Sequence, residues 1–266
     1  MIINFHKLHG TGNDFILIDN RQQLLRGDEF ILFAKLCTRR FGIGADGLIL
    51  IEDHPELDFE MKYYNADGRP STLCGNGGRC AIRFASNLGI IGLSTVFQAV
   101  DGPHEGKLHS NKLVGLKMAN VSKLVQGEGD YVLDTGSPHY VKFVRNLDEF
   151  DVVSAGKKIR YSDVFSKQGI NVNFVEFTDD GIKVRTYERG VEDETYSCGT
   201  GVVAAALATA VELGFDQGIA ELKVRTLGGN LKVDFHIGEG EHFSGIWLTG
   251  AAQYVYSGSF DTMDFL

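Results

Sequence analysis

The chain has 266 residues, which is enough for one large domain or for two domains of ordinary size. Its composition is that of a soluble globular protein, and its net charge of −9 includes no block of like charge. These features argue against nucleic acid and an anionic membrane surface as partners, because both attract a basic patch. No secretory signal or bilayer-spanning apolar run is evident, so we expect a cytoplasmic location with four reduced cysteines.

The first part of the chain is expected to form short strands and an amphipathic helix ahead of the first cysteine motif. Strands are expected at 2–9, 15–19, 48–51 and 57–64. A tight turn of glycine and short polar residues at 9–14 joins the first two strands. An amphipathic helix is expected at 28–39, with Asp28 as its cap. Its buried face is expected to consist of Phe30, Leu32, Phe33 and Leu36.

A cysteine followed by a Gly-x-Gly turn then opens a second helix. Cys74-Gly75-Asn76-Gly77 precedes an apolar run that ends at Leu88-Gly89, where glycine is a C-terminal helix signal. Cys74 therefore lies at a helix N-terminus, where unpaired N–H groups and the helix dipole lower the pKa of a thiol. The same N–H groups can hold a carboxylate. Cys80 falls inside this helix and, like Cys37, is expected to be a buried core residue.

The second part of the chain contains the same kind of stretch. Short strands and turns at 95–118 are expected to close the first unit, and 121–144 to begin the second, before a mixed polar segment at 150–165. Further strands are expected at 171–175, 182–187, 222–226, 231–235, 244–249 and 254–260. Among them, Cys198-Gly199-Thr200-Gly201 opens a third helix that ends at Leu213-Gly214. Cys198 is therefore predicted to lie at a helix N-terminus as well.

The two cysteine stretches belong to a longer internal repeat. The separation from Gly12 to Cys74 and the separation from Gly136 to Cys198 are both 62 residues. The segment at 11–15 resembles the segment at 135–140. We interpret this pattern as a duplication that predicts two similar units, each contributing one cysteine.

The repeat also marks three polar side chains as candidate site residues. Glu188 and Arg189 occupy the place in the second unit that Asn65 occupies in the first. His139 lies at the position that matches 14–15 of the first unit, which makes it a candidate site residue. A Glu–Arg pair beside a thiolate can supply an acid/base modulator and a clamp for a carboxylate.

Two like cysteines in two like units suit the inversion of a stereocentre that bears an acidic C–H. Such a reaction needs a base on one face of the carbon and an acid on the other, and the reverse reaction exchanges their roles. A thiolate and a thiol meet this need, while the helix N-termini stabilise the carboxylate and the charge that grows on it.

The motifs as a group resemble the diaminopimelate epimerase family. They are His9-Gly10-Thr11-Gly12-Asn13-Asp14-Phe15, Asn65-Ala66-Asp67-Gly68, Cys74-Gly75-Asn76-Gly77-Gly78-Arg79-Cys80, Glu188-Arg189-Gly190 and Cys198-Gly199-Thr200-Gly201. The resemblance implies a cofactor-independent epimerase of lysine and peptidoglycan-precursor synthesis that interconverts LL- and meso-diaminopimelate. It also implies an α/β fold (α+β) of two pseudo-symmetric domains, each a curved, mostly antiparallel sheet wrapped around a central helix. The domains are expected at 1–118 plus 251–266 and at 119–250, and a homodimer is expected.

The resemblance also assigns roles to individual residues. Cys74 and Cys198 would be the paired acid and base, with no metal and no pyridoxal phosphate. His139 and Glu188 would modulate their pKa values. The substrate contacts implied are Asn13, Asn65, Gly75, Asn76, Asn171, Glu188, Arg189, Gly199 and Thr200. Ser137 and Gly47 depart from residues that are common in the family.

Two other hypotheses stay open at this point. One is a related isomerase of the proline-racemase type, although Glu188-Arg189 favours a substrate with a second, distal carboxylate. The other is a non-catalytic zinc protein, with the metal held by Cys74, Cys198, His139 and Glu188.

Overall fold

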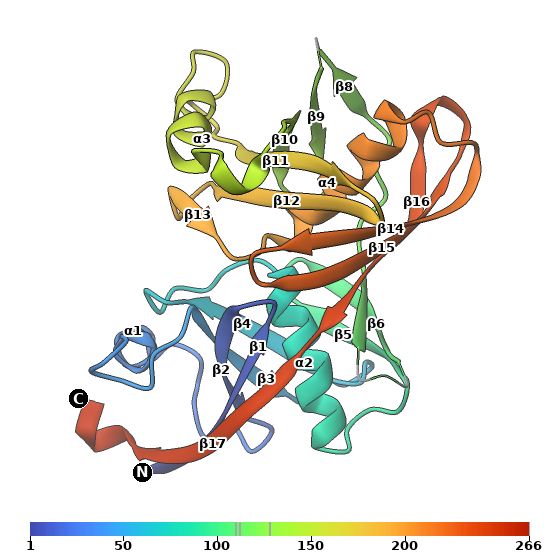
Figure 1. The fold of residues 1–266 in the computed structure, drawn as a ribbon. Helices are drawn as coiled ribbons and strands as arrows, with labels where there is room; N and C mark the ends of the chain where they lie inside the picture. Colours follow the sequence, from blue (N-terminus) through green and yellow to red (C-terminus); the bar gives the residue numbers. More distant parts are fainter. Residues whose placement is uncertain (110, 112, 128, 266) are drawn as a thin grey trace. The chain divides into compact units, whose positions relative to one another are not determined.

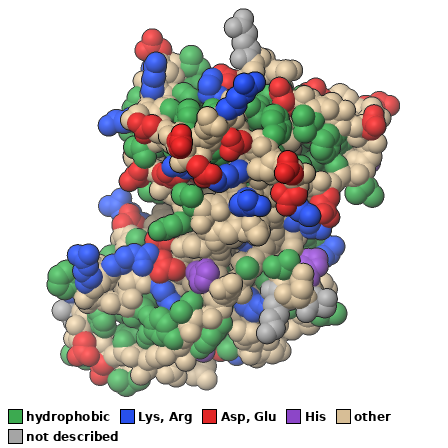
Figure 2. All heavy atoms as spheres, viewed as in Figure 1, with side chains coloured by type: hydrophobic (Ala, Val, Ile, Leu, Met, Phe, Trp, Pro, Cys, Tyr) green, Lys and Arg blue, Asp and Glu red, His purple; other side chains and the backbone are tan. Residues whose placement is uncertain are grey.

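The computed structural model describes the chain except residues 110, 112, 128 and 266, and it divides into two compact units (Figure 1). Unit 1 contains residues 1–116 and 250–266, and unit 2 contains residues 117–249. In the described part of the chain, no helix is both long enough and apolar enough to cross a membrane. Figure 2 shows acidic and basic side chains mixed over the visible face rather than gathered by sign.

The sheet of unit 1 begins with the last strand of the chain. Its order is β17 (Gln253–Asp261), β1 (Ile2–Gly10), β2 (Asn13–Asp19), β3 (Gly47–Glu52), β4 (Glu60–Asn65), β5 (Ser94–Ala99), β6 (Gly102–Leu108) and β7 (Leu113–Lys117). The pairs β2–β3 and β4–β5 are parallel, and the other pairs are antiparallel. The turn between β1 and β2 is only Thr11-Gly12, so Asn13 already lies in a strand.

The sheet of unit 2 repeats this pattern. Its order is β8 (Leu124–Gln126), β9 (Asp130–Asp134), β10 (Pro138–Phe143), β11 (Asn171–Thr178), β12 (Gly181–Glu188), β14 (Gly218–Thr226) and β15 (Gly229–Ile237). Here β10–β11 and β12–β14 are the parallel pairs. β13 (Asp193–Thr195) pairs with the end of β12, and β16 (Phe243–Ala251) forms a bridge from Phe243 to Val121.

The strand register confirms the duplication. Phe15 of β2 lies opposite Gly47, the first residue of the next parallel strand, and His139 of β10 lies opposite Asn171 in the same way. Ser137 therefore corresponds to Asn13, because each precedes its register residue by two positions. The predicted fold of two similar mixed units is confirmed, and each sheet is mostly antiparallel.

A central helix in each unit begins at the residue after a cysteine. The two predicted helices are confirmed as α2 (Gly75–Asn87) and α4 (Gly199–Glu212). Both end as expected, with Gly89 at φ 72° and Gly214 at φ 63°, where glycine accepts the left-handed backbone that ends a helix.

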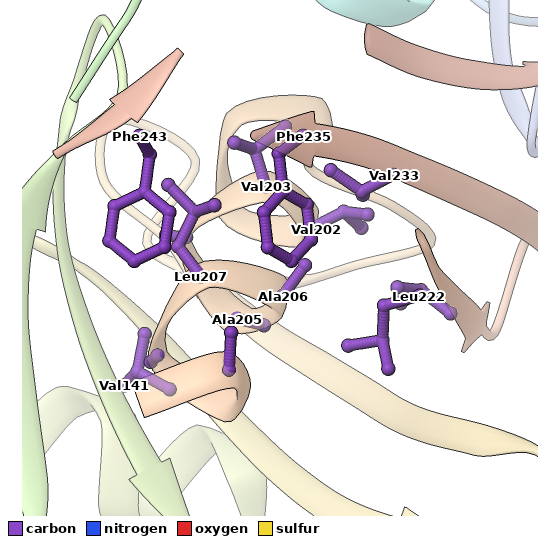
Figure 3. Close-up of a cluster of buried hydrophobic side chains, with 14 of the residues drawn as sticks. Val141, Val202, Val203, Ala205, Ala206, Leu207, Leu222, Val233, Phe235 and Phe243 are labelled. Carbon is purple, nitrogen blue, oxygen red and sulfur yellow. The ribbon is translucent and has the colours of Figure 1, made fainter. Parts of the chain in front are cut away.

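Helix α4 is buried on all sides, which is typical of a helix inside a core. From Gly199 to Ala210 every residue except Thr200 is buried. Val203 and Leu207 pack among Phe235, Phe243 and their neighbours on the surrounding strands (Figure 3). Because the helix body is held in this way, the position of its N-terminus relative to the strands of unit 2 is fixed by packing.

A second helix in each unit covers the other face of its sheet. α1 (Phe30–Cys37) packs Leu32, Phe33 and Leu36 inward as predicted, but Phe30 is 41% exposed, so its predicted burial is wrong. The helix is also shorter than 28–39, and Glu29 rather than Asp28 occupies the N-cap position. The Glu29 carboxylate accepts hydrogen bonds from the backbone N–H groups of 26 and 27 instead of capping the helix.

The segment at 150–165 contains a helix that the sequence analysis missed. It is α3 (Val152–Arg160), whose N-cap residue Asp151 accepts a hydrogen bond from the Ser154 backbone N–H at 3.1 Å. The described residues also form short 3-10 helices at Leu147–Glu149, Glu239–Glu241 and Thr262–Phe265.

Candidate active site

Cys74 is the N-cap residue of α2. Its backbone is extended, with φ −90° and ψ 123°, and its carbonyl accepts the first hydrogen bond of the helix from Gly78 at 2.7 Å. Its side chain makes no capping hydrogen bond and is partly exposed. The first-turn N–H groups, including those of Gly75 and Asn76, are therefore not capped by the cysteine and can face an anion.

Two asparagine side chains lie beside this sulfur. Asn13 places its Oδ1 3.5 Å from the Cys74 Sγ and 3.4 Å from the Asn76 Nδ2. Its Nδ2 donates to the Asp46 carboxylate at 2.7 Å. Because a carboxylate only accepts, this bond fixes the orientation of the Asn13 amide, and its oxygen faces the sulfur. Asn13 and Asn76, both predicted as substrate contacts, thus lie in contact around Cys74.

A chain of ion pairs holds the strand that carries Asn13. The Asp14 carboxylate pairs with Lys7 at 2.8 Å and with Arg39 at 2.5 Å, and Arg39 also contacts Asp46 at 2.9 Å. Burial alone would raise the pKa of Asp14, but hydrogen bonds from Arg39 and Lys7 outweigh it and hold the pKa well below its usual range. The network keeps Asp46 in place as the acceptor for the Asn13 amide.

Arg79 lies fully buried under the N-terminal turn of α2. Its guanidinium donates to the Asn76 Oδ1 at 2.8 Å, to the Thr11 hydroxyl at 3.1 Å and to the Gly75 carbonyl at 3.4 Å. Its Nε has no hydrogen-bond partner, and among the described residues no carboxylate forms an ion pair with it. A cation without a counter-ion therefore lies below the place where the helix can accept an anion.

Asn65 and Gly47 lie opposite each other where β4 ends and β3 begins. The Asn65 side chain is exposed, and no described contact joins it to Cys74. At Gly47, an added Cβ would come within 2.6 Å of the Tyr63 ring and of the Tyr64 carbonyl. The strand pair therefore leaves no room for a side chain at 47.

Cys198 occupies the same position on α4 that Cys74 occupies on α2. It is the N-cap residue, with φ −107° and ψ 114°, and its carbonyl accepts a hydrogen bond from Val202 at 2.9 Å. Its side chain is partly exposed and lies 3.4 Å from the Thr200 hydroxyl. Gly199 and Thr200 form the first turn, and the Thr135 hydroxyl holds the Thr200 carbonyl at 2.9 Å.

His139 is fully buried beneath this turn. Its Nε2 lies 2.9 Å from the Thr200 Oγ1, and its Nδ1 lies 3.1 Å from the Asn173 Nδ2. Burial, assisted by the charge of Arg189, lowers the pKa of His139 to about 3, so the ring is neutral at neutral pH. Since both ring nitrogens have polar partners, neither is open to a metal ion, which disfavours the zinc hypothesis.

Asn171, Ser137 and Arg189 form one polar cluster at the end of the strands. The Asn171 amide donates to the Ser137 hydroxyl at 2.9 Å, and its oxygen accepts the Arg189 backbone N–H at 2.9 Å. The exposed Arg189 guanidinium donates to the Ser137 hydroxyl at 3.3 Å and to the Gln168 carbonyl at 3.2 Å. Within the described residues, no carboxylate is paired with Arg189, so its guanidinium is open to a ligand.

Glu188 lies at the end of β12, as Asn65 does at the end of β4. Its Oε2 accepts a hydrogen bond from the Thr195 hydroxyl at 2.8 Å, which ties it to β13. Glu188 as a whole is half-buried.

Several polar residues of these sites were given no role in the sequence analysis. They are Thr11, Asp46, Arg79, Thr135 and Asn173. The alternation of Asn171 and Asn173 was an available signal, because residues two apart in a strand share a face.

Cys37 and Cys80 are buried as predicted, and burial raises the pKa of each thiol to about 12. Among the residues described, no three of the types His, Cys, Asp and Glu gather to hold a metal.

Comparisons with known proteins support the resemblance seen in the motifs. The family model described as diaminopimelate epimerase matches residues 5–120 and 131–255. A diaminopimelate epimerase of Flavobacterium psychrophilum is 48% identical, covering 96% of this chain and 98% of the relative. One from Chlorobaculum tepidum is 44% identical, covering 95% and 99%.

Solved structures share the fold at low sequence identity. A PhzF-family phenazine biosynthesis protein of Bacillus anthracis aligns with a TM-score of 0.77 at 16% identity, covering 98% of this chain and 99% of that one. A hydroxyproline epimerase from Agrobacterium vitis aligns with a TM-score of 0.68 at 14% identity, covering 97% and 92%. At such identities the likeness concerns the fold alone.

Proposed function

The chain belongs to the diaminopimelate epimerase family, and on this premise we propose that it interconverts LL- and meso-diaminopimelate by a two-cysteine mechanism without a cofactor. In this mechanism one cysteine thiolate removes the proton from a substrate α-carbon. The thiol of the other cysteine delivers a proton to the opposite face of the same carbon. Cys74 and Cys198 exchange these roles in the reverse reaction.

The helix N-termini supply the electrostatic part of the proposal. Removal of the α-proton moves negative charge onto the adjacent carboxylate. Backbone N–H groups at the starts of α2 and α4 are aligned to receive that charge, because neither N-cap side chain makes a capping bond. Gly75, Asn76, Gly199 and Thr200 are the residues assigned to this contact.

The remaining side chains are assigned to the rest of the substrate. Arg189 is open to a ligand and can clamp a distal carboxylate through two parallel hydrogen bonds. Asn171 holds the backbone of Arg189, and Asn13 and Asn65 lie at strand ends in unit 1. Glu188 modulates the acid/base chemistry through its carboxylate. His139 acts only as a neutral hydrogen-bonding group, because its pKa is too low for proton transfer at neutral pH.

One observation carries the proposal. Each duplicated unit places a cysteine at the N-cap of its central helix, and this cysteine is partly exposed and its side chain makes no capping hydrogen bond. The two other cysteines, Cys37 and Cys80, are buried and have raised pKa values. Acid/base chemistry by thiols is therefore assigned to one cysteine in each unit.

Deuterium uptake from D2O into diaminopimelate tests the proposal. We expect Cys74→Ala and Cys198→Ala each to abolish epimerisation, because one thiol cannot serve both faces of the carbon. The matched control is Cys37→Ala, which removes a buried thiol of α1 and should leave turnover close to that of the wild type. Near-normal epimerisation by either active-site variant would contradict the two-cysteine mechanism.

The same assay with proline distinguishes diaminopimelate epimerase from the alternative isomerase of the proline-racemase type, since Arg189 favours a dicarboxylate substrate.

We also propose a homodimer in the cytoplasm. Exposed apolar surface favours association, and β17 carries exposed side chains at Tyr254, Val255 and Tyr256, which supports an interface along this strand. Sedimentation analysis that finds only monomers would remove the dimer from the proposal.

A further inference from the structure

Asn173 is a fully buried polar residue of β11 that lies directly below the first turn of α4. A Cβ added at Gly201 would come within 2.3 Å of the Asn173 Oδ1, so glycine at 201 is what lets the helix sit on this amide. The Asn173 side chain contacts His139, Thr186 and the backbone of Tyr140. All its contacts lie inside unit 2.

The neighbours of Asn173 leave its amide only one orientation. The group that faces the Tyr140 carbonyl, at 3.0 Å, must be the NH2 group, because a carbonyl only accepts hydrogen bonds. The Thr186 hydroxyl donates to the Oδ1 at 3.0 Å. The second N–H of the amide then points at the His139 Nδ1, at 3.1 Å.

This orientation determines the tautomer of His139. A neutral imidazole carries one proton, and a nitrogen that accepts a hydrogen bond does not carry it. Since the Nδ1 accepts from Asn173, the proton is on the Nε2, which donates to the Thr200 Oγ1 at 2.9 Å. The Thr200 hydroxyl already accepts from the ring, so its own proton can point at the Cys198 Sγ, at 3.4 Å.

We propose that Asn173 is a positioning residue for Cys198: it fixes His139 as the Nε2–H tautomer, and the Thr200 hydroxyl thereby donates to the Cys198 thiolate. The inference rests on the proposed function, in which Cys198 is an acid/base group. A hydrogen bond donated to the charged form of a group stabilises that form, so the chain favours the thiolate at this helix N-terminus.

The charged groups around His139 preserve the direction of these hydrogen bonds, which run from Asn173 through His139 and Thr200 to Cys198. His139 is buried, and its lowered pKa prevents the ring from gaining the second proton that would make both nitrogens donors. Arg189 acts on the ring through its charge, and Glu188 is the acidic group at the end of β12. From the neighbouring strand and helix, Asn173 and Thr200 present neutral groups.

The first test reads the tautomer of His139 directly by 15N NMR of histidine-labelled protein, with the signal assigned through His139→Gln. We expect an unprotonated Nδ1 and a protonated Nε2 in the wild type. In Asn173→Asp the residue can only accept from the ring, so a proton should appear on the Nδ1. The matched control is Asn230→Asp, the same change at an exposed position of β15, which should leave the tautomer unchanged.

The second test measures the Cys198 thiolate through the pH dependence of its alkylation by iodoacetamide, without substrate and in a Cys74→Ser background. Thr200→Val should raise the pKa of Cys198 by about one to two units, because a hydrogen bond to a charged group is lost. Thr200→Ser retains the hydroxyl, so the pKa of Cys198 should stay within about half a unit of its value without the Thr200 substitution.

Each test can overturn the inference. An Nδ1–H tautomer in the wild type, or an Nδ1 that stays unprotonated in Asn173→Asp, would show that Asn173 does not set the ring. An unchanged Cys198 pKa in Thr200→Val would show that the hydroxyl does not support the thiolate. Neither measurement involves turnover, so these failures differ from failure of the proposed function, which would appear as epimerisation by Cys198→Ala.

Discussion

Replacement of Arg79 by methionine tests separately how the buried charge affects the rate of epimerisation and how it affects the free energy of unfolding. The Arg79 backbone lies five residues after the N-cap of α2, which at 1.5 Å per residue is about 7.5 Å along the helix axis. Its guanidinium reaches back to Asn76 and Gly75 in the first turn, so about 7.5 Å is an upper value for the distance from its charge to the helix N-terminus. At an effective dielectric constant of about 20, a unit positive charge at that distance stabilises a negative charge by about 2.2 kcal/mol. Arg79→Met should therefore reduce kcat/KM for epimerisation by about 40-fold.

The same substitution should cost little stability. Burial lowers the pKa of Arg79, because taking its charge out of water costs free energy. The Asn76 Oδ1 keeps a donor when the guanidinium is removed, because the Thr11 hydroxyl lies 3.2 Å away. Methionine fills similar space without a charge, so the free energy of unfolding in urea should change by less than about 2 kcal/mol.

Deuterium exchange at the substrate α-carbon gives kcat/KM, and urea unfolding of the same protein preparations gives the free energy of unfolding. Arg79→Lys is the matched comparison, because it keeps the charge while losing the planar fork, and it should retain most of kcat/KM. A folded Arg79→Met protein with kcat/KM within about threefold of the wild type would refute the electrostatic argument. A loss of activity that merely follows unfolding would refute it as well.

Two further perturbations test the buried groups around the sites. Because burial lowers the pKa of His139 from 6.5 to about 3, only the unfolded chain binds a proton there as the pH falls between these values. The free energy of unfolding should then fall by about 1.4 kcal/mol per pH unit below 6.5, a slope that His139→Gln should remove in urea titrations. Gly47→Ala should lower the free energy of unfolding by about 1–3 kcal/mol, because its Cβ would clash with Tyr63 and Tyr64. Gly92→Ala, where an added Cβ meets nothing within 4 Å, is the matched control, and equal losses from both would contradict the packing argument.

The central helices were predictable because residues at their own ends signal where each helix begins and ends. A cysteine before Gly-x-Gly and a Leu-Gly pair after an apolar run set the start and end of α2, and the same signals set those of α4. The internal repeat added long-range information, since equal spacing in the two halves predicts equal structure. That expectation is confirmed by the matching register of β2–β3 and β10–β11.

Helix α3 was not predictable in this way, because tertiary packing rather than local pattern positions it. Gly156 lies in its middle and lowers its helix propensity. A Cβ there would come within 2.4 Å of the Tyr187 Cβ, so the glycine is required for the helix to lie close against β12. The signals that did exist were Asp151 before the helix and the basic residues 157, 158 and 160 in its last turn.

The polar groups beneath the cysteines were the hardest to predict, because a sequence does not show which side chains meet. Asn13 and Asn171 were expected at a site from the family resemblance, whereas Asn173 was passed over two positions from Asn171. Its importance appears only when the Tyr140 carbonyl, His139 and Gly201 are seen around it. A buried amide becomes informative once its partners fix its orientation.

The duplication placed two sulfurs in equivalent backbone positions, yet the residues below them differ in kind. Counting from each cysteine, Arg79 of α2 corresponds to Val203 of α4, and both are fully buried. One helix N-terminus therefore lies over a cation, and the other lies over the neutral His139 with its hydrogen-bonded Thr200. A reversible epimerisation requires each cysteine to hold and to release a proton, but it does not require equal means of stabilising the two thiolates. In the proposal each unit supplies one acid/base cysteine, and the divergent residues set the affinity of each sulfur for its proton by different physical means.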